Sequence, residues 1–359
     1  MKSVSPLLVL LLAASLVLGL AACGQEPAPA PSSSILEEQR PLPSSQTPDS
    51  SAESASEPAP SPSSMAEFPP AVPSPSSGVP VSPSSQAPSP SATRDDGPIF
   101  SVSTDTVKAG DNIFLFAENL PEDAKVTGET DLDFTPTFYA YDGKWVAAMP
   151  IRYTLEPGSY QITIRSGEDS HTFPIAVTDG GFEVETFTVD QSVADSTIND
   201  GGANAEYEQV TRPLKNMGDN EKYWSGKFAM PLRQEALKVS SSFGYTRIVN
   251  GVASIHGGVD FPAPQGTPVT APNRGRVLFA GFLKLTGNTV VVEHGFGLKS
   301  WYYHMDSLDC KTGDMLETGD PIGKVGTTGF STGNHLHFAM SVNNIYVNPW
   351  QYLENDMLD

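Results

Sequence analysis

The chain has 359 residues, a hydrophobic fraction of 38% and a formal net charge of −21. From Gly226 onward, 10 Lys or Arg residues stand against 11 Asp or Glu residues, a balance of −1, so nearly all of the acidity lies upstream. This distribution argues against nucleic-acid binding, which requires basic patches, and we expect no nucleic-acid partner.

Residues 1–22 have the pattern of a bacterial signal peptide. Lys2 precedes an apolar run that is too short to span a bilayer comfortably and ends in Leu20-Ala21-Ala22-Cys23-Gly24. This ending resembles the lipobox of bacterial lipoproteins, which implies that Cys23 is lipidated. The alternative is an ordinary secretory signal with an incidental cysteine. The resemblance predicts a protein held by its lipid on the extracytoplasmic face of the cell membrane.

Residues 23–97 form the next predicted segment, and about half of its residues are Pro or Ser. Such a composition buries too little apolar surface to offset the entropy of ordering the chain. We therefore expect a disordered or polyproline-like stalk. As a coil it would reach on the order of 50 Å, and fully extended it would approach ~200 Å.

Residues 98–181 are predicted to form a small immunoglobulin-like β-sandwich, because short apolar runs alternate with turns about every ten residues. Asp142-Gly143 between two such runs is typical of a two-residue hairpin. His171 is expected in a turn, and nothing in this module suggests catalysis. A connecting segment, 182–227, is expected to contain a strand at 182–189 and a helix-tolerant stretch at 203–217.

Residues 228–353 are predicted to form a second β-domain, an antiparallel sheet with a groove, and 354–359 a short tail. The predicted fold class of the whole chain is therefore all-β. Five of the six histidines lie in this domain, between positions 256 and 337.

Two histidine spacings in this domain indicate a metal site. His335 and His337 lie two residues apart, so on a strand both would project from the same face. Two glycines separate His256 from Val259-Asp260 and would let the backbone bend so that His256 and Asp260 converge. A lone His-x-His is more often a surface or core feature than a ligand pair. Two histidines and one carboxylate, however, leave a fourth position for water, the pattern of catalytic zinc.

The motifs of this region together resemble the lysostaphin/LytM-type zinc endopeptidases, over some 110 residues and in the same order. The residues that carry the resemblance include Phe243-Gly-Tyr-Thr-Arg247, His256-Gly-Gly-Val-Asp260, Gly266-Thr-Pro-Val-Thr-Ala271, Tyr303-His304-Met and Gly326-Thr-Thr-Gly-Phe-Ser-Thr-Gly-Asn-His335-Leu-His337.

The resemblance implies a zinc endopeptidase that cuts peptide cross-links of peptidoglycan in cell-wall remodelling. It implies that His256, Asp260 and His337 bind zinc and that His335 and His304 are catalytic. His335 would accept the proton of the attacking water and His304 would donate hydrogen bonds. The alternative is a catalytically silent, wall-binding regulator of other hydrolases. Members of that kind have lost some of these positions, whereas this chain keeps all five.

Three further residues have structural interpretations. His294 is expected to be a turn histidine that packs beside the sheet. Arg247 is either structural or substrate-facing. Cys310 is expected to be a small buried hydrophobe in a strand, and with Cys23 acylated no intramolecular disulfide can form.

Overall fold

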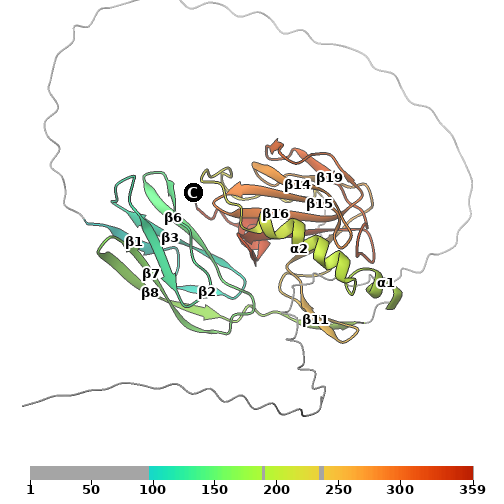
Figure 1. Cartoon of the computed structure of the whole chain (residues 1–359), viewed down its shortest axis with the longest axis horizontal. Coiled ribbons are helices and arrows are strands. Elements are labelled where there is room, and N and C mark those ends of the chain that lie inside the picture. The colour runs from blue at the N-terminus through green and yellow to red at the C-terminus, as the bar shows by residue number, and fades with distance from the viewer. Residues whose placement is uncertain (1–96, 188–190, 234–237, 359) are drawn as a thin grey trace, which may run out of the picture. The chain divides into compact units, whose positions relative to one another are not determined.

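The structure of the protein is a computed structural model, and it describes residues 97–187, 191–233 and 238–358. The predicted signal peptide, the lipidation site Cys23 and the predicted stalk up to residue 96 lie outside the described residues. Most of the described elements are β-strands, which confirms the all-β prediction (Figure 1). Across these described ranges, no helix has both the length and the apolar character needed to cross a membrane.

The first β-region consists of two four-stranded sheets with the strand orders β1-β3-β6-β5 and β2-β8-β7-β4. Their core contains residues at alternate positions of facing strands, such as Ile113 and Leu115 on β3 and Ile162 and Ile164 on β7. Alternate side chains of a strand point to one face, so each sheet contributes one apolar face to the sandwich. The strands are β1 Ile99–Val102, β2 Thr106–Lys108, β3 Asn112–Glu118, β4 Val126–Thr130, β5 Tyr139–Tyr141, β6 Lys144–Pro150, β7 Gly158–Ser166 and β8 Asp169–Thr178.

The hairpin predicted at Asp142-Gly143 is confirmed. Tyr141 pairs with Lys144 across the turn, and both intervening residues have positive φ, 49° for Asp142 and 72° for Gly143. Two consecutive positive φ angles define the tight turn that matches the twist of paired strands.

Between the two β-regions lie β9 Val184–Phe187, α1 Gln191–Ser196 and α2 Gly201–Lys215. The stretch expected to tolerate a helix is therefore helical, and Asp200 caps α2 by accepting a hydrogen bond from Gly202 N. Strand β9 pairs in parallel with β10 in the three-stranded sheet β11-β10-β9. The two partner strands are β10 Thr246–Val249 and β11 Val252–Ile255.

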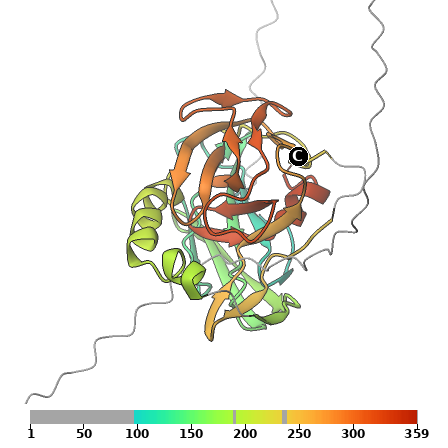
Figure 2. The same ribbon diagram turned by 90° about the vertical axis from the view of Figure 1, so that its right-hand side faces the viewer.

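The main C-terminal sheet has seven strands in the order β12-β20-β16-β15-β14-β18, with β21 paired to β20, and every pairing is antiparallel. Helix α2 packs on this sheet, and Figures 1 and 2 show it beside the strands. The strands are β12 Gly258–Pro262, β14 Gly275–Leu283, β15 Gly287–Gly295, β16 Leu298–Met305, β18 Met315–Leu316, β20 His335–Val342 and β21 Ile345–Val347. A smaller sheet contains β13 Pro268–Thr270, β19 Pro321–Lys324 and β17 Ser307–Leu308, and α3 Pro349–Glu354 follows β21.

The sandwich and the main sheet share a packed boundary. Tyr139 of β5 stacks on Phe296, which lies in the turn between β15 and β16, with ring centroids 4.7 Å apart and an interplanar angle of 11°. Gln351 of α3 accepts a hydrogen bond from Asn112 N at 2.6 Å and donates one to Asn112 O at 3.2 Å. Stacked aromatic rings and paired backbone groups hold the two β-regions in a defined relation.

Candidate metal centre

Three of the sequence-predicted residues converge on one point. His256 follows β11, Asp260 lies on β12 and His337 on β20. Asp260 Oδ1 lies 3.0 Å from His256 Nε2 and 2.8 Å from His337 Nδ1, and the two imidazole nitrogens are 3.0 Å apart. The three side chains are buried, and among the described residues they form a group that can hold a metal ion.

Strand pairing explains how residues 77 positions apart come together. In the antiparallel pair β12–β20, Asp260 stands directly opposite His337. Residues opposite each other in such a pair project to the same face with their Cβ atoms about 5 Å apart. The ligand geometry is therefore fixed by backbone hydrogen bonds rather than by a flexible loop.

Gly258 has a different role from the one expected. It begins strand β12 rather than bending the chain, and a Cβ there would lie 2.6 Å from Cε1 and Nε2 of His337 and from Phe338 O. Only glycine lets the backbone pass so close to the ligand imidazole.

Backbone carbonyls fix the orientation of three imidazoles. His256 Nδ1 lies 2.8 Å from Ser242 O, His335 Nδ1 2.7 Å from Gly333 O and His304 Nδ1 2.7 Å from Thr328 O. A carbonyl oxygen only accepts, so each of these nitrogens carries the proton and Nε2 of the neutral ring has the lone pair. In His256 this is the nitrogen that faces Asp260.

Burial keeps these imidazoles neutral. It is the main cause that lowers the pKa of His256, with the nearby Arg247 charge next, to about 4. Burial also lowers the pKa of His335, and burial together with the charges of His335 and His337 lowers that of His304 well below its usual value. Neutral imidazole is the form that binds metals and accepts protons.

Asp260 is an ionised carboxylate within this buried site. Burial by itself raises its pKa, but the neighbouring His256 and His337 outweigh burial and hold the pKa well below the usual range. Its second oxygen, Oδ2, lies 3.2 Å from Nη2 of Arg247, which is fully buried. Arg247 also donates to Ser241 Oγ. Arg247 thus holds the second oxygen of the carboxylate and orients it. Of the two interpretations from the sequence, structural or substrate-facing, this contact supports the structural one.

His304 and His335 form a second pair next to the three converging residues. Their ring centroids are 5.1 Å apart, and the His304 ring lies 6.3 Å from that of His337. His335 Nε2 is buried and has no hydrogen-bond partner among the described residues. His304 has φ of 63°, an uncommon conformation for a residue with a side chain, and such strain is concentrated at functional sites. All five residues singled out from the sequence therefore occupy one site.

Tyr303 was not identified from the sequence as part of this site. Its ring stacks on His337 with centroids 5.0 Å apart and an interplanar angle of 9°, and its hydroxyl lies 3.1 Å from that of Tyr207 on α2. In the sequence, only the position of Tyr303 next to His304 indicated that it could belong to the site. Stacking against the His337 imidazole could not be inferred from that position alone.

Three residues outside the site differ from expectation. His294 is a fully buried residue within β15 rather than a turn residue, with Nδ1 2.8 Å from Arg274 O and Nε2 2.8 Å from Ser300 Oγ. His171 is an exposed residue of β8. Cys310 is half-buried and lies after β17 instead of in a strand. Its thiol lies 3.6 Å from the carbonyl oxygen of Ile322.

Comparisons with known proteins address the same region. Residues 254–349 match the model of peptidase family M23. These residues form an M23 peptidase domain. The domain includes all five residues of the site, whereas Arg247 lies upstream of it.

Two relatives that align with the M23 domain have names of endopeptidases, and one of the names includes peptidoglycan. The chain is 39% identical over 113 residues to "DD-carboxypeptidase/endopeptidase Mpg" of Neisseria meningitidis, covering 31% of this chain and 26% of that protein. It is 38% identical over 114 residues to "Peptidoglycan DD-endopeptidase ShyC" of Vibrio cholerae, again covering 31% and 26%. The similarity thus spans about a quarter of the length of these relatives.

A solved structure is similar over more of the chain. A putative peptidase M23 from Pseudomonas aeruginosa matches with a TM-score of 0.50 and 24% identity, covering 69% of this chain and 94% of that one. This match supports the fold.

The contact between Arg247 and Asp260 predicts a test of metal affinity. We expect Arg247→Met to raise the dissociation constant for Zn²⁺ by roughly 10- to 100-fold, because a carboxylate without its orienting partner is a poorer ligand. Competition with a chromophoric chelator measures this constant on protein whose circular dichroism matches wild type. Arg233→Met, at an exposed position, is the control and should leave it unchanged. Unchanged affinity in Arg247→Met would show that the contact does not support the site.

The buried His294 predicts a pH-dependent stability. Burial, the main cause, lowers the pKa of His294 from 6.5 to about 4. Between these values the unfolded chain binds a proton that the folded chain does not, so stability falls as pH decreases from 6.5 to 4. The loss is ~3 kcal/mol by linkage. Asparagine does not titrate, so between pH 6.5 and 4 the free energy of unfolding of His294→Asn should fall by about 3 kcal/mol less than that of wild type. Urea unfolding at both pH values measures this difference. Equal losses in wild type and variant would contradict this account.

Proposed function

We propose that the protein is a zinc-dependent endopeptidase that hydrolyses peptide cross-links of peptidoglycan. The observation that carries the proposal is the site itself, in which two imidazoles and a carboxylate converge beside a second pair of buried, neutral imidazoles. The names of relatives that align over the M23 domain support the substrate class.

The donor set favours zinc. Two imidazole nitrogens and one carboxylate oxygen are the three protein ligands typical of catalytic zinc, which keeps a fourth position open. The buried Nε2 of His335, which lacks a partner among the described residues, would be available to the attacking water. His256, Asp260 and His337 would hold the ion. When bound, zinc supplies Lewis-acid polarisation of the scissile carbonyl and of the attacking water.

The remaining side chains would move protons. The Nδ1–H of His335 is held by Gly333 O, so its Nε2 is oriented to accept a proton from the attacking water. His304 is held in the same way by Thr328 O, and its neutral Nε2 is also an acceptor. An acceptor at Nε2 differs from the expectation that His304 donates hydrogen bonds. His304 can donate only after it has gained a proton, which it can then pass to the leaving amine.

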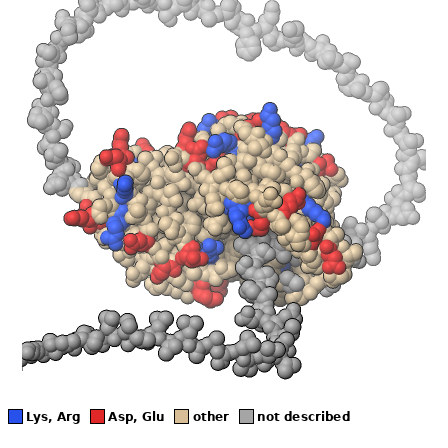
Figure 3. Space-filling view, in the orientation of Figure 1, with Lys and Arg blue, Asp and Glu red and all other residues tan. Residues whose placement is uncertain are grey.

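Anchoring to the membrane is part of the proposal. The lipobox-like sequence ending at Cys23 and the Pro/Ser-rich segment after it support a lipid-anchored enzyme with a long tether. Acidic and basic side chains are interspersed on the face shown in Figure 3. Access to the wall would therefore depend on the tether rather than on electrostatic attraction.

The two histidines of β20 should separate metal binding from proton transfer. We expect His335→Ala to keep bound zinc but to lose roughly 10²- to 10⁴-fold in turnover of cross-linked peptidoglycan fragments, the usual contribution of acid–base catalysis. His337→Ala should lose both bound zinc and turnover, because it removes a proposed metal ligand. Metal content by mass spectrometry and product release by chromatography measure the two effects.

The exposed His171→Ala is the matched control and should keep both metal and activity. Loss of zinc in His335→Ala together with its retention in His337→Ala would reverse the ligand assignment. Full activity of His335→Ala would remove it from the mechanism.

The proposed anchor has a separate test. Cys23→Ala removes the thiol that would be acylated, so we expect the protein to leave the membrane fraction or to accumulate unprocessed. Fractionation with immunodetection, and metabolic labelling with a fatty-acid analogue, measure this. A variant that partitions and labels as wild type does would exclude lipidation at this position.

A further inference from the structure

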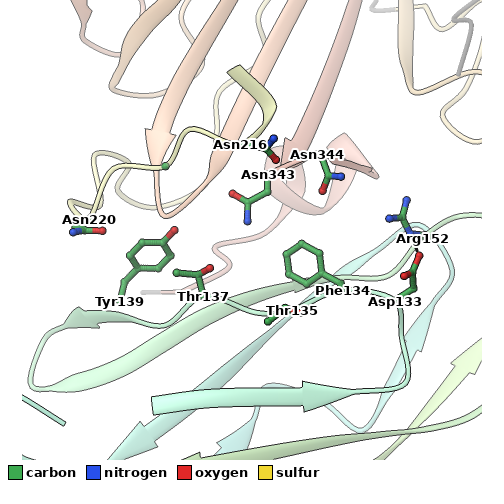
Figure 4. A pocket seen from close by; sticks show the side chains of 11 residues that line it. Asp133, Phe134, Thr135, Thr137, Tyr139, Arg152, Asn216, Asn220, Asn343 and Asn344 are labelled. Carbon is green, nitrogen blue, oxygen red and sulfur yellow. Dashed lines mark ion pairs between the residues drawn. The ribbon is translucent and has the colours of Figure 1, made fainter. Parts of the chain in front are cut away.

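A polar pocket of about 480 Å³ lies between the β-sandwich and the main sheet, and none of the five residues of the metal centre lines it (Figure 4). Four asparagines line one side of it: Asn216 and Asn220 from the segment after α2, and Asn343 and Asn344 from the turn between β20 and β21. Side chains of the sandwich, among them Phe134 and Thr137, line the opposite side.

One wall of the pocket is held in place by packing. Tyr139, which lines the pocket, is the residue that stacks on Phe296. Trp224 packs edge-on against the same Phe296 ring with centroids 5.7 Å apart. A wall that is already fixed loses little conformational entropy when a ligand binds against it.

The chemistry of the lining favours a neutral, hydroxyl-rich ligand. Each asparagine amide offers both hydrogen-bond donors and acceptors, as hydroxyl and acetamido groups require. The two charged residues in the lining, Asp133 and Arg152, pair with each other at 3.4 Å, so together they contribute no net charge. Phe134, between the polar side chains, offers an aromatic face to the C–H face of a sugar ring.

The pocket is connected to the metal centre by a single strand. Asn343 and Asn344 directly follow β20, the strand that begins with His335 and contains His337. Asn343 lies six residue steps along the chain from His337, about 20 Å at the usual rise per residue. A fully extended peptide of about six residues spans a similar length.

We propose that this pocket binds the amino-sugar glycan of peptidoglycan while the metal centre acts on the attached peptide. The inference rests on the proposed function and adds a second binding site to it. The glycan holds the substrate in one register on the enzyme, and β20 sets the distance from the bound sugar to the cleaved bond.

The test uses a peptide-free glycan, the tetramer of β-1,4-linked N-acetylglucosamine, titrated into the full chain by calorimetry. We expect saturable binding to wild type and on the order of ten-fold weaker binding to Asn220→Ala/Asn344→Ala, which lacks two amides. Phe134→Ala should weaken binding to a similar degree. Asn355→Ala, an exposed asparagine outside the pocket, should bind as wild type does.

Hydrolysis assays separate this inference from the proposed function. The double variant should cleave a glycan-free cross-linked peptide at the wild-type rate but show a higher KM for intact peptidoglycan. Glycan binding that is absent from wild type, or equally strong in the double variant, would overturn the pocket assignment whatever the enzyme cleaves. Glycan binding that depends on the asparagines, without hydrolysis of either substrate, would support the pocket and contradict the proposed function.

Discussion

The site depends on the antiparallel pairing of β12 with β20. This pairing places Asp260 opposite His337, and the turn into β12 brings His256 to the same point. Because a shift of one residue would turn one of the two side chains to the other face of the sheet, the ligand set exists only in this register. Gly258 is required by the same pairing, since any side chain there would meet the imidazole of His337.

Burial then determines the chemistry of the site. An ionised carboxylate in a buried site is costly unless it is paired and hydrogen-bonded. Asp260 meets this condition through His337, whose Nδ1 lies 2.8 Å from Oδ1, and through Arg247, whose Nη2 lies 3.2 Å from Oδ2. Burial has the opposite effect on the imidazoles, because it keeps them neutral and able to bind metal or accept protons. One environment thus keeps the acid ionised and the bases neutral.

The sequence was sufficient to predict the members of the site but not how they are supported. The spacing of His335 and His337 predicted a shared strand face, and the structure places both on β20. The role of Arg247 remained open, because its contact with Asp260 depends on how β10 lies against β12. The same limit explains His294, whose partners are Arg274, just before β14, and Ser300 on β16. Local patterns reveal periodicity and turns such as Asp142-Gly143, whereas contacts between strands emerge only from the folded sheet.

X-ray absorption at the zinc edge of the metal-loaded protein tests the central claim most directly, because it reports the identity of the bound atoms. We expect a first shell of two imidazole nitrogens, one carboxylate oxygen and an oxygen from solvent in wild type, and little or no bound zinc in His337→Ala. A shell that contains sulfur, a third imidazole or four protein ligands would contradict it. So would a first shell that His337→Ala leaves unchanged.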